Sequence, residues 1–305
     1  MSTITRTVPT NKGLLAIIQA HPLAAYFFLA YAGAWIVIAP LVMNSMGWIN
    51  LSEGASFLLF FFSSLSGPAL AAYYVTGVLE DKAGMKRLFR RTFQGRAGLR
   101  WYLVALFSFL ALWLGAYSVF YAGAPLVNLL QNGSLLLSVF LPNVILGLLI
   151  PSIGEEPGWR GFALPRLQAR YGPILGTVIL GTFHGIWHLP AFFTPLLGPI
   201  TIDGFIAFVL TAIGGTFLYT WVFNNTRSSV WIAMVLHASS NAASNLLGEL
   251  VPKNTALAAS TEAFLTGWMN VFLFGVVALL LVVFTHGKLG YQRLDTQPGS
   301  RSEKG

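Results

Sequence analysis

The sequence predicts an all-α fold in which about eight helices form a polytopic membrane bundle. Three observations predict it: 55% of the 305 residues are hydrophobic, only 9% are charged, and long apolar stretches recur along the chain. A soluble domain usually carries about 25% charged residues, and a disordered chain is poor in large apolar residues. Both classes are therefore excluded.

The absence of cysteine limits the covalent links, metal sites and kinds of catalysis that the chain can support. It excludes disulfides, cysteine-ligated zinc, iron–sulfur clusters and thiol catalysis.

Eight stretches have the ~20 apolar residues that a bilayer core requires. They cover residues 22–44, 55–78, 101–122, 134–156, 173–194, 203–222, 229–248 and 263–285. The first is too long for a signal peptide, so we expect it to be retained. We expect residues 1–290 to form one transmembrane domain and residues 291–305 to form a disordered cytoplasmic tail.

The basic residues predict the orientation. If both termini share one side, 17 of the 18 lysines and arginines fall on that side, and Lys253 is the exception. The positive-inside rule then makes both termini cytoplasmic, and we expect a multi-pass protein of a bacterial plasma membrane. The net charge of +8 therefore reflects topology and not nucleic-acid binding.

The segment 81–100 is basic and amphipathic. We expect it to lie on anionic lipid headgroups, with a partner-binding helix as the alternative.

Ionisable residues are costly inside a membrane, and here they concentrate in three of the predicted helices. The first group is Glu155, Glu156 and Arg160. Because Glu156 and Arg160 are four residues apart, they share a helical face and can pair. Glu155 points about 100° away and is free to act as a general base. Taken alone, the group also fits an ion pair at a helix end.

The second group is His184 and His188, one helical turn apart. Their spacing resembles a metal-binding H-E-x-x-H motif, but Gly185 stands where the glutamate would be. Gly181 and Gly185 form a G-x-x-x-G pattern that lets another helix approach closely. The alternative is a pair of buried histidines bonded to backbone.

The third group is His237, Asn241 and Asn245, which form one polar stripe on a helix. Histidine and asparagine can donate hydrogen bonds to a developing oxyanion. The alternative is polar contact between helices.

Together these residues resemble the CPBP family of intramembrane proteases, which includes CAAX and bacteriocin-processing (Abi) proteins and the type-II prenyl-protein endopeptidase. The family pattern is E-E-x-x-x-R, then F-x-x-x-H, then H-x-x-x-N or H-x-x-x-D. Glu155, Glu156 and Arg160 match the first motif. His188 matches the histidine of the second motif, and His237 with Asn241 match the third. The motif-bearing core spans 134–248. His184 stands where the family has an aromatic residue, so we treat it as a possible neighbour of the site.

The resemblance implies hydrolysis of peptide bonds of membrane-associated or lipidated substrates, with CAAX-prenylated proteins as one class, in a cytoplasm-facing intramembrane cavity. Glu155 would activate water, His188 would position it, and His237 with Asn241 would stabilise the oxyanion. Glu156 and Arg160 would hold the Glu155 segment.

No cofactor is favoured. Zinc bound by Glu155, His188 and His237 is the alternative, and it would remove Glu155 as a free base.

Helix depth adds one expectation. With the helix boundaries given above, Glu155 would lie at the end of its helix and far from the histidines. We therefore expect that helix to continue past Pro157 towards Arg166.

Other functions remain open on the sequence alone. Intramembrane glutamate and histidine also serve transporters and proton relays. Three histidines could ligate a b-type haem, and the same fold could be a non-catalytic immunity or scaffold protein.

Overall fold

The computed structural model describes residues 13–195, 197, 201–253 and 259–292. These residues form helices and contain no strand, which confirms the all-α class. Residues 293–305 of the expected tail lie outside the described part of the chain.

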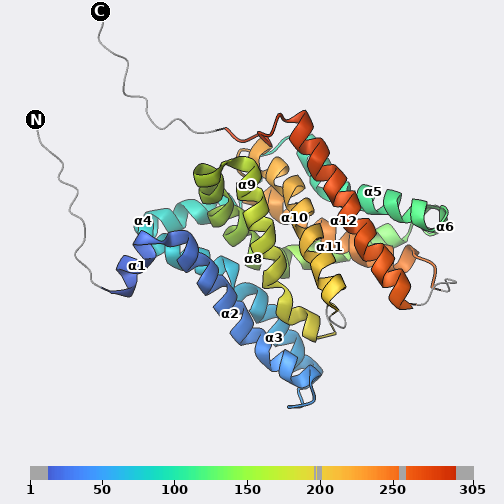
Figure 1. Cartoon of the computed structure of the whole chain (residues 1–305), viewed down its shortest axis with the longest axis horizontal. Helices are drawn as coiled ribbons and strands as arrows, with labels where there is room; N and C mark the ends of the chain where they lie inside the picture. The colour runs from blue at the N-terminus through green and yellow to red at the C-terminus, as the bar shows by residue number, and fades with distance from the viewer. Residues whose placement is uncertain (1–12, 196, 198–200, 254–258, 293–305) are drawn as a thin grey trace, which may run out of the picture.

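The first half of the bundle begins and ends with a short helix and has longer helices between them (Figure 1). It consists of α1 (Leu14–Ala20), α2 (Pro22–Ser45), α3 (Glu53–Ser66), α4 (Pro68–Thr92), α5 (Leu99–Phe120) and α6 (Ala124–Gln131). The helices α3 and α4 follow one another across a kink at Gly67, where Pro68 starts the second helix. Proline is favoured at a first helical position because its missing N–H has no intrahelical acceptor there.

The second half carries the motifs. Its first helical run is η1 (Leu136–Phe140), α7 (Leu141–Gly147), η2 (Leu148–Ser152), α8 (Ile153–Gly158), η3 (Trp159–Ala163), α9 (Leu164–Trp187) and η4 (Leu189–Phe193). It continues with α10 (Ile202–Asn225), α11 (Val230–Leu250) and α12 (Ala259–Phe284). The segments η1, η2 and η3 are π-helical turns, which often mark functional sites.

Six of the described helices or uninterrupted helical runs are long and apolar enough to cross a membrane. One of these runs, Leu136–Phe193, covers nearly all of both the fourth and the fifth predicted stretch. The two parts fold onto each other because Gly172 has a φ of 79°, a conformation that glycine adopts without strain. A Cβ at Gly176 would lie 2.9 Å from the backbone of Leu167 across this bend.

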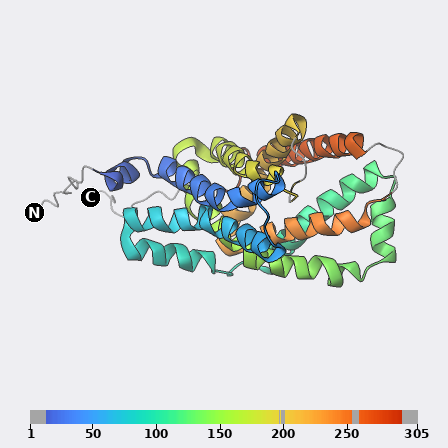
Figure 2. The same cartoon turned by 90° about the horizontal axis from the view of Figure 1, so that it is seen from below.

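The two ends of the bundle differ in charge. We call the end that holds residues 82–100, 166–172 and 227–229 the basic end, because most of the described lysines and arginines lie there. The opposite end holds the connections 46–52 and 121–123 and residues 188–195, and we call it the far end. Figure 2 shows the second half of α4, at the basic end, on the left and α6 on the right.

Close helix packing positions the histidine-bearing helices. A Cβ at Gly181 would lie 2.6 Å from Cα of Ile213 on α10, and one at Gly185 would lie 3.1 Å from Cα of Val209. The G-x-x-x-G pattern therefore lets α9 approach α10 closely, as predicted. The helix α11 is largely buried among its neighbours, including α5, α7 and α10.

Candidate active site

Glu155 lies on α8 at the centre of the molecule. Two glycines fix its position, because a Cβ at Gly154 would lie 2.6 Å from the carbonyl oxygen of Ser64, and one at Gly158 would lie 2.4 Å from that of Pro68. The helix α8 can therefore pack directly against the kink between α3 and α4. The Glu155 residue is only 4% exposed.

One oxygen of the Glu155 carboxylate holds both of its hydrogen bonds. Its Oε2 accepts from Nε1 of Trp159 at 3.3 Å and pairs with Nε2 of His184 at 3.1 Å. Its Oε1 has no such bond within the described residues, so it is the oxygen available to a water or substrate. Trp159 was not singled out from the sequence, although its spacing of four residues from Glu155 was a usable signal.

The helix of Glu155 continues past Pro157, as predicted. The segments η3 and α9 follow without a break and carry the chain beyond Arg166. Arg160 lies inside this continuous run and is fully buried. The π-helical turns on both sides of α8 fit the expectation that Pro157 disturbs the local helix.

Glu156 joins two helices. Its Oε1 accepts from Nη1 of Arg160 at 2.8 Å, which is the predicted ion pair, and both side chains are fully buried. The same oxygen lies 2.9 Å from Nδ1 of His237 on α11. The expectation was that Glu156 and Arg160 hold the Glu155 segment, and the contacts show that Glu156 also bonds His237.

Tyr219 of α10 lies beneath this ion pair. Its ring centroid is 4.1 Å from Cζ of Arg160, a cation–π distance, and its hydroxyl lies 3.1 Å from Oγ of Ser240. No sequence signal marked Tyr219, because a tyrosine in an apolar helix is ordinary.

His188 presents one ring nitrogen to the cavity. Its Nδ1 lies 2.9 Å from the carbonyl oxygen of His184, and a carbonyl can only accept, so Nδ1 carries the proton. The Nε2 atom of the neutral ring then has a free lone pair. His184 occupies the same face one turn earlier, and the two ring centroids are 5.0 Å apart.

The side chains also define a possible metal site. Within the described residues, one group of three histidine or carboxylate side chains has ligand atoms that all lie within 4.8 Å of one another: Glu155, His184 and His188. The zinc set expected from the sequence contained His237 in place of His184. The geometry therefore brings a different histidine to the carboxylate.

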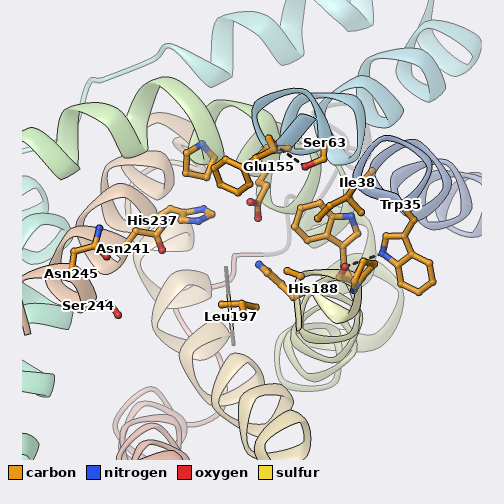
Figure 3. A pocket seen from close by; sticks show the side chains of 17 residues that line it. Trp35, Ile38, Ser63, Glu155, His188, Leu197, His237, Asn241, Ser244 and Asn245 are labelled. Carbon is orange, nitrogen blue, oxygen red and sulfur yellow. Dashed lines mark hydrogen bonds between the residues drawn. The ribbon is translucent and has the colours of Figure 1, made fainter. Parts of the chain in front are cut away.

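A cavity of about 380 Å³ opens beside Glu155. Figure 3 shows Glu155, His188 and His237 directed towards this common space, with Asn241 on the same helix as His237. One wall is polar and comes from α11, which contributes His237, Asn241, Ser244 and Asn245. The facing wall is mostly apolar and comes from α2, α3, the end of α9 and the chain that follows η4, and its members are Ala34, Trp35, Ile38, Phe60, Trp187 and Leu197.

Asn245 is held by a residue that sequence reasoning missed. Its Nδ2 donates to Oδ1 of Asn143 on α7 at 2.7 Å. Asn143 has no motif around it, so only the fold reveals the pair.

Comparison with known proteins agrees with the motifs. A family model described as "Type II CAAX prenyl endopeptidase Rce1-like" matches residues 136–243. A curated protein of Methanococcus maripaludis, CAAX prenyl protease 2, is 30% identical over 114 residues. That match covers 35% of this chain and 41% of the relative. The family-model match includes Glu155, His188 and His237, so this part of the chain is similar to the CAAX prenyl endopeptidases that its motifs resemble, and the chain spans less than half the length of the curated relative.

Proposed function

We propose that this protein is an intramembrane endopeptidase that hydrolyses a peptide bond of a membrane-associated or lipidated substrate. One observation carries the proposal: a buried carboxylate, two imidazoles and an amide from three separate helices line one cavity in a chain built of membrane-type helices. Such groups are costly inside a membrane, and function is the usual reason for them.

Glu155 acts as the general base. Its Oε2 is held by Trp159 and His184, which leaves Oε1 to take a proton from water. The oxygen of that water attacks the carbonyl carbon of the substrate and forms a tetrahedral intermediate. The C–N bond then breaks, and the proton passes from Glu155 to the leaving amine.

His188 positions the attacking water. Because its Nδ1 donates to a backbone carbonyl, its Nε2 accepts a hydrogen bond from the water on the cavity side. This bond and that to Glu155 together fix the water within reach of the scissile carbonyl.

His237 and Asn241 stabilise the oxyanion. The Nδ2 group of Asn241 is a donor at any pH. His237 donates through Nε2 when both of its nitrogens are protonated, and Glu156 beside Nδ1 stabilises that charged ring. Glu156 and Arg160 are therefore positioning residues for His237.

We propose that no metal is required. The alternative is zinc held by Glu155, His184 and His188, a His₂Glu donor set that fits zinc, with the His188 Nδ1 bond acting as an outer-shell support. A bound zinc ion would supply Lewis acidity and a water of lowered pKa.

The shape of the cavity suits a lipidated substrate. Its apolar wall contains aromatic and aliphatic side chains that can contact a hydrocarbon chain, whereas the polar wall of α11 can bond a peptide backbone. A prenylated peptide combines both chemistries, and the family name supports that choice.

The basic segment gives a second contact with the membrane. Lys82, Lys86, Arg90, Arg96 and Arg100 are exposed and have no carboxylate partner within the described residues. We propose that they bind anionic headgroups, at about 1 kcal/mol for each basic residue near such a surface.

The test is cleavage of quenched-fluorescence peptides by the purified protein in detergent or lipid discs. The peptides carry either a farnesylated or an unmodified cysteine, and wild type is compared with Glu155→Gln, which keeps the shape and removes the base. We expect cleavage by wild type, unaffected by a zinc chelator, and a loss of about 10²–10⁴-fold in Glu155→Gln.

Two results contradict parts of the proposal. Equal cleavage by wild type and Glu155→Gln would remove Glu155 as the base. Loss of cleavage with chelator and its recovery with added zinc would favour the metal alternative.

A further inference from the structure

The side-chain amides of Asn143 and Asn245 form a relay whose direction is fixed by a backbone carbonyl. The Nδ2 atom of Asn143, on α7, donates to the carbonyl oxygen of Val139 at 2.8 Å. Because a carbonyl oxygen can only accept, the nitrogen of this amide must face Val139, and its Oδ1 is the atom left for Asn245. The Nδ2 atom of Asn245 therefore donates to that oxygen, at 2.7 Å.

The relay leaves the Oδ1 atom of Asn245 as an unused acceptor. Among the described residues, none donates a hydrogen bond to it. Asn245 is exposed and lines the cavity, on the same wall as Asn241 and one helical turn farther from His237 (Figure 3). Asn143 does not line the cavity. Asn245 thus presents to the cavity an acceptor whose orientation is set from outside it, and a contact between helices α7 and α11 needs only the other end of the amide.

Asn241 and Asn245 are spaced like the hydrogen-bonding groups of an extended peptide. Four residues on a helix span about 6 Å. Along one edge of an extended backbone, the carbonyl and N–H groups recur every two residues, about 6.6 Å. A substrate whose scissile carbonyl accepts from Asn241 can therefore place a backbone N–H group of the same edge beside Asn245.

Such an N–H group needs an acceptor when it leaves water for this cavity, because an unpaired buried N–H is costly. In the proposed reaction Glu155 and His188 accept from the attacking water, so neither is available to the substrate backbone. The Oδ1 atom of Asn245 takes no part in that step, and it accepts at any pH because the amide does not titrate.

We propose that Asn245 is a substrate-binding residue whose Oδ1 accepts a backbone N–H of an extended peptide segment near the scissile bond, and that Asn143 is the positioning residue that directs this acceptor. The proposal deepens the endopeptidase function proposed above and rests on it for the substrate. It also narrows the substrate class, because proline has no N–H to donate and is disfavoured at that one position.

The test removes the backbone N–H groups of the peptide one at a time. In a series of the farnesylated peptide described above, each member carries one ester in place of one amide, which removes an N–H and keeps the shape. Surface plasmon resonance measures Kd for the Glu155→Gln protein in lipid discs, with empty discs as the reference. The same measurement is made after adding Asn245→Ala, Asn143→Leu or the control Ser244→Ala, which removes a hydroxyl from the same cavity wall.

We expect an ester at one position to weaken binding by about three- to tenfold, the effect of one hydrogen bond. The same ester should cause no further loss in Asn245→Ala or in Asn143→Leu, whereas Ser244→Ala should keep the full loss. This non-additivity indicates a direct contact between the two groups that are removed. A merely structural role of the Asn143–Asn245 pair would weaken the binding of all the peptides equally.

The proposal is overturned if no ester weakens binding, if the ester that does so has the same effect in Asn245→Ala, or if none of the peptides binds. Should Asn245→Ala not fold, Asn143→Leu decides the question, because it misdirects the same acceptor without changing the cavity wall. If only Asn245→Ala abolishes the ester effect, the positioning role of Asn143 is overturned and Asn245 remains the acceptor.

Because binding does not require catalysis, its result is separate from that of the cleavage test. A protein that shows the ester effect but cleaves no peptide would retain this binding site and lose the endopeptidase. A protein that cleaves the peptides without any ester effect would retain the endopeptidase and lose the proposed role of Asn245.

Discussion

The Nδ1 atom of His237 lies 2.9 Å from Oε1 of Glu156, and this contact joins helices α11 and α8 across 81 residues of sequence. Within the described residues, the neighbouring Glu155 shares no hydrogen bond with this pair and bonds His184 and Trp159 instead. Two adjacent carboxylates therefore hold two different histidines. Glu155 is therefore the candidate general base, and Glu156 is the candidate structural carboxylate.

The buried ion pair predicts an asymmetric stability effect. Arg160→Met leaves the Glu156 charge buried with only His237 beside it, and we expect the free energy of unfolding to fall by about 3–5 kcal/mol. The double variant Glu156→Gln with Arg160→Met removes both charges and should recover most of that loss. Thermal unfolding in detergent compares the proteins, and a double variant less stable than Arg160→Met would contradict the prediction.

We expect substitution of Asn241 to lower kcat without changing KM. If its amide donates to the oxyanion, Asn241→Ala lowers kcat by about 10²–10³-fold and leaves KM nearly unchanged. The matched control is Asn245→Ala, which removes the same amide one turn along the same helix. Steady-state kinetics on a cleaved peptide separate the two, and equal kcat losses in both variants would argue against an oxyanion donor at Asn241.

The position of His184 in the possible metal site predicts how its substitution changes the affinity for zinc. His184→Phe removes one of the three ligands of the possible metal site and introduces the aromatic residue of the family pattern. If zinc binds at this group, we expect titration calorimetry to show binding in wild type and a loss of at least tenfold in affinity in His184→Phe. His237→Phe is the control, since His237 is outside the group, and equal loss in the two variants would place zinc elsewhere.

The cation–π contact of Tyr219 with Arg160 predicts different stability losses for two substitutions of Tyr219. Tyr219→Phe keeps the aromatic face under Arg160 and should change stability little, whereas Tyr219→Leu removes it and should cost about 2 kcal/mol or more in this desolvated setting. The apparent melting temperature of each variant measures the difference. Equal melting temperatures for Phe and Leu would show that the cation–π contact contributes nothing.

The basic segment predicts lipid selectivity. Replacing Lys82, Lys86 and Arg90 with glutamine removes three exposed charges and should reduce the amount of anionic lipid that copurifies with the protein. Mass spectrometry of the bound lipids measures the ratio of anionic to zwitterionic species. The control is Lys253→Gln, at the far end, which should leave the ratio unchanged.

Much of this molecule follows from its sequence because the physical signals are local. Apolar stretches of bilayer length predicted the helices, and the spacing of Glu156 and Arg160 predicted their ion pair, which the structure contains. The pattern of Gly181 and Gly185 predicted a close helix contact. The need to bring Glu155 near the histidines predicted that its helix passes Pro157.

Contacts between residues far apart in the chain are visible only in the tertiary structure. There His184 is a partner of Glu155, His237 is a partner of Glu156, and Asn143 is the partner of Asn245. The tertiary structure also decided which helices line the cavity, because that depends on which helix halves pack tightly and which diverge. Hydropathy and motif spacing carry no such information, since both are unchanged when a helix rotates or slides against its neighbours.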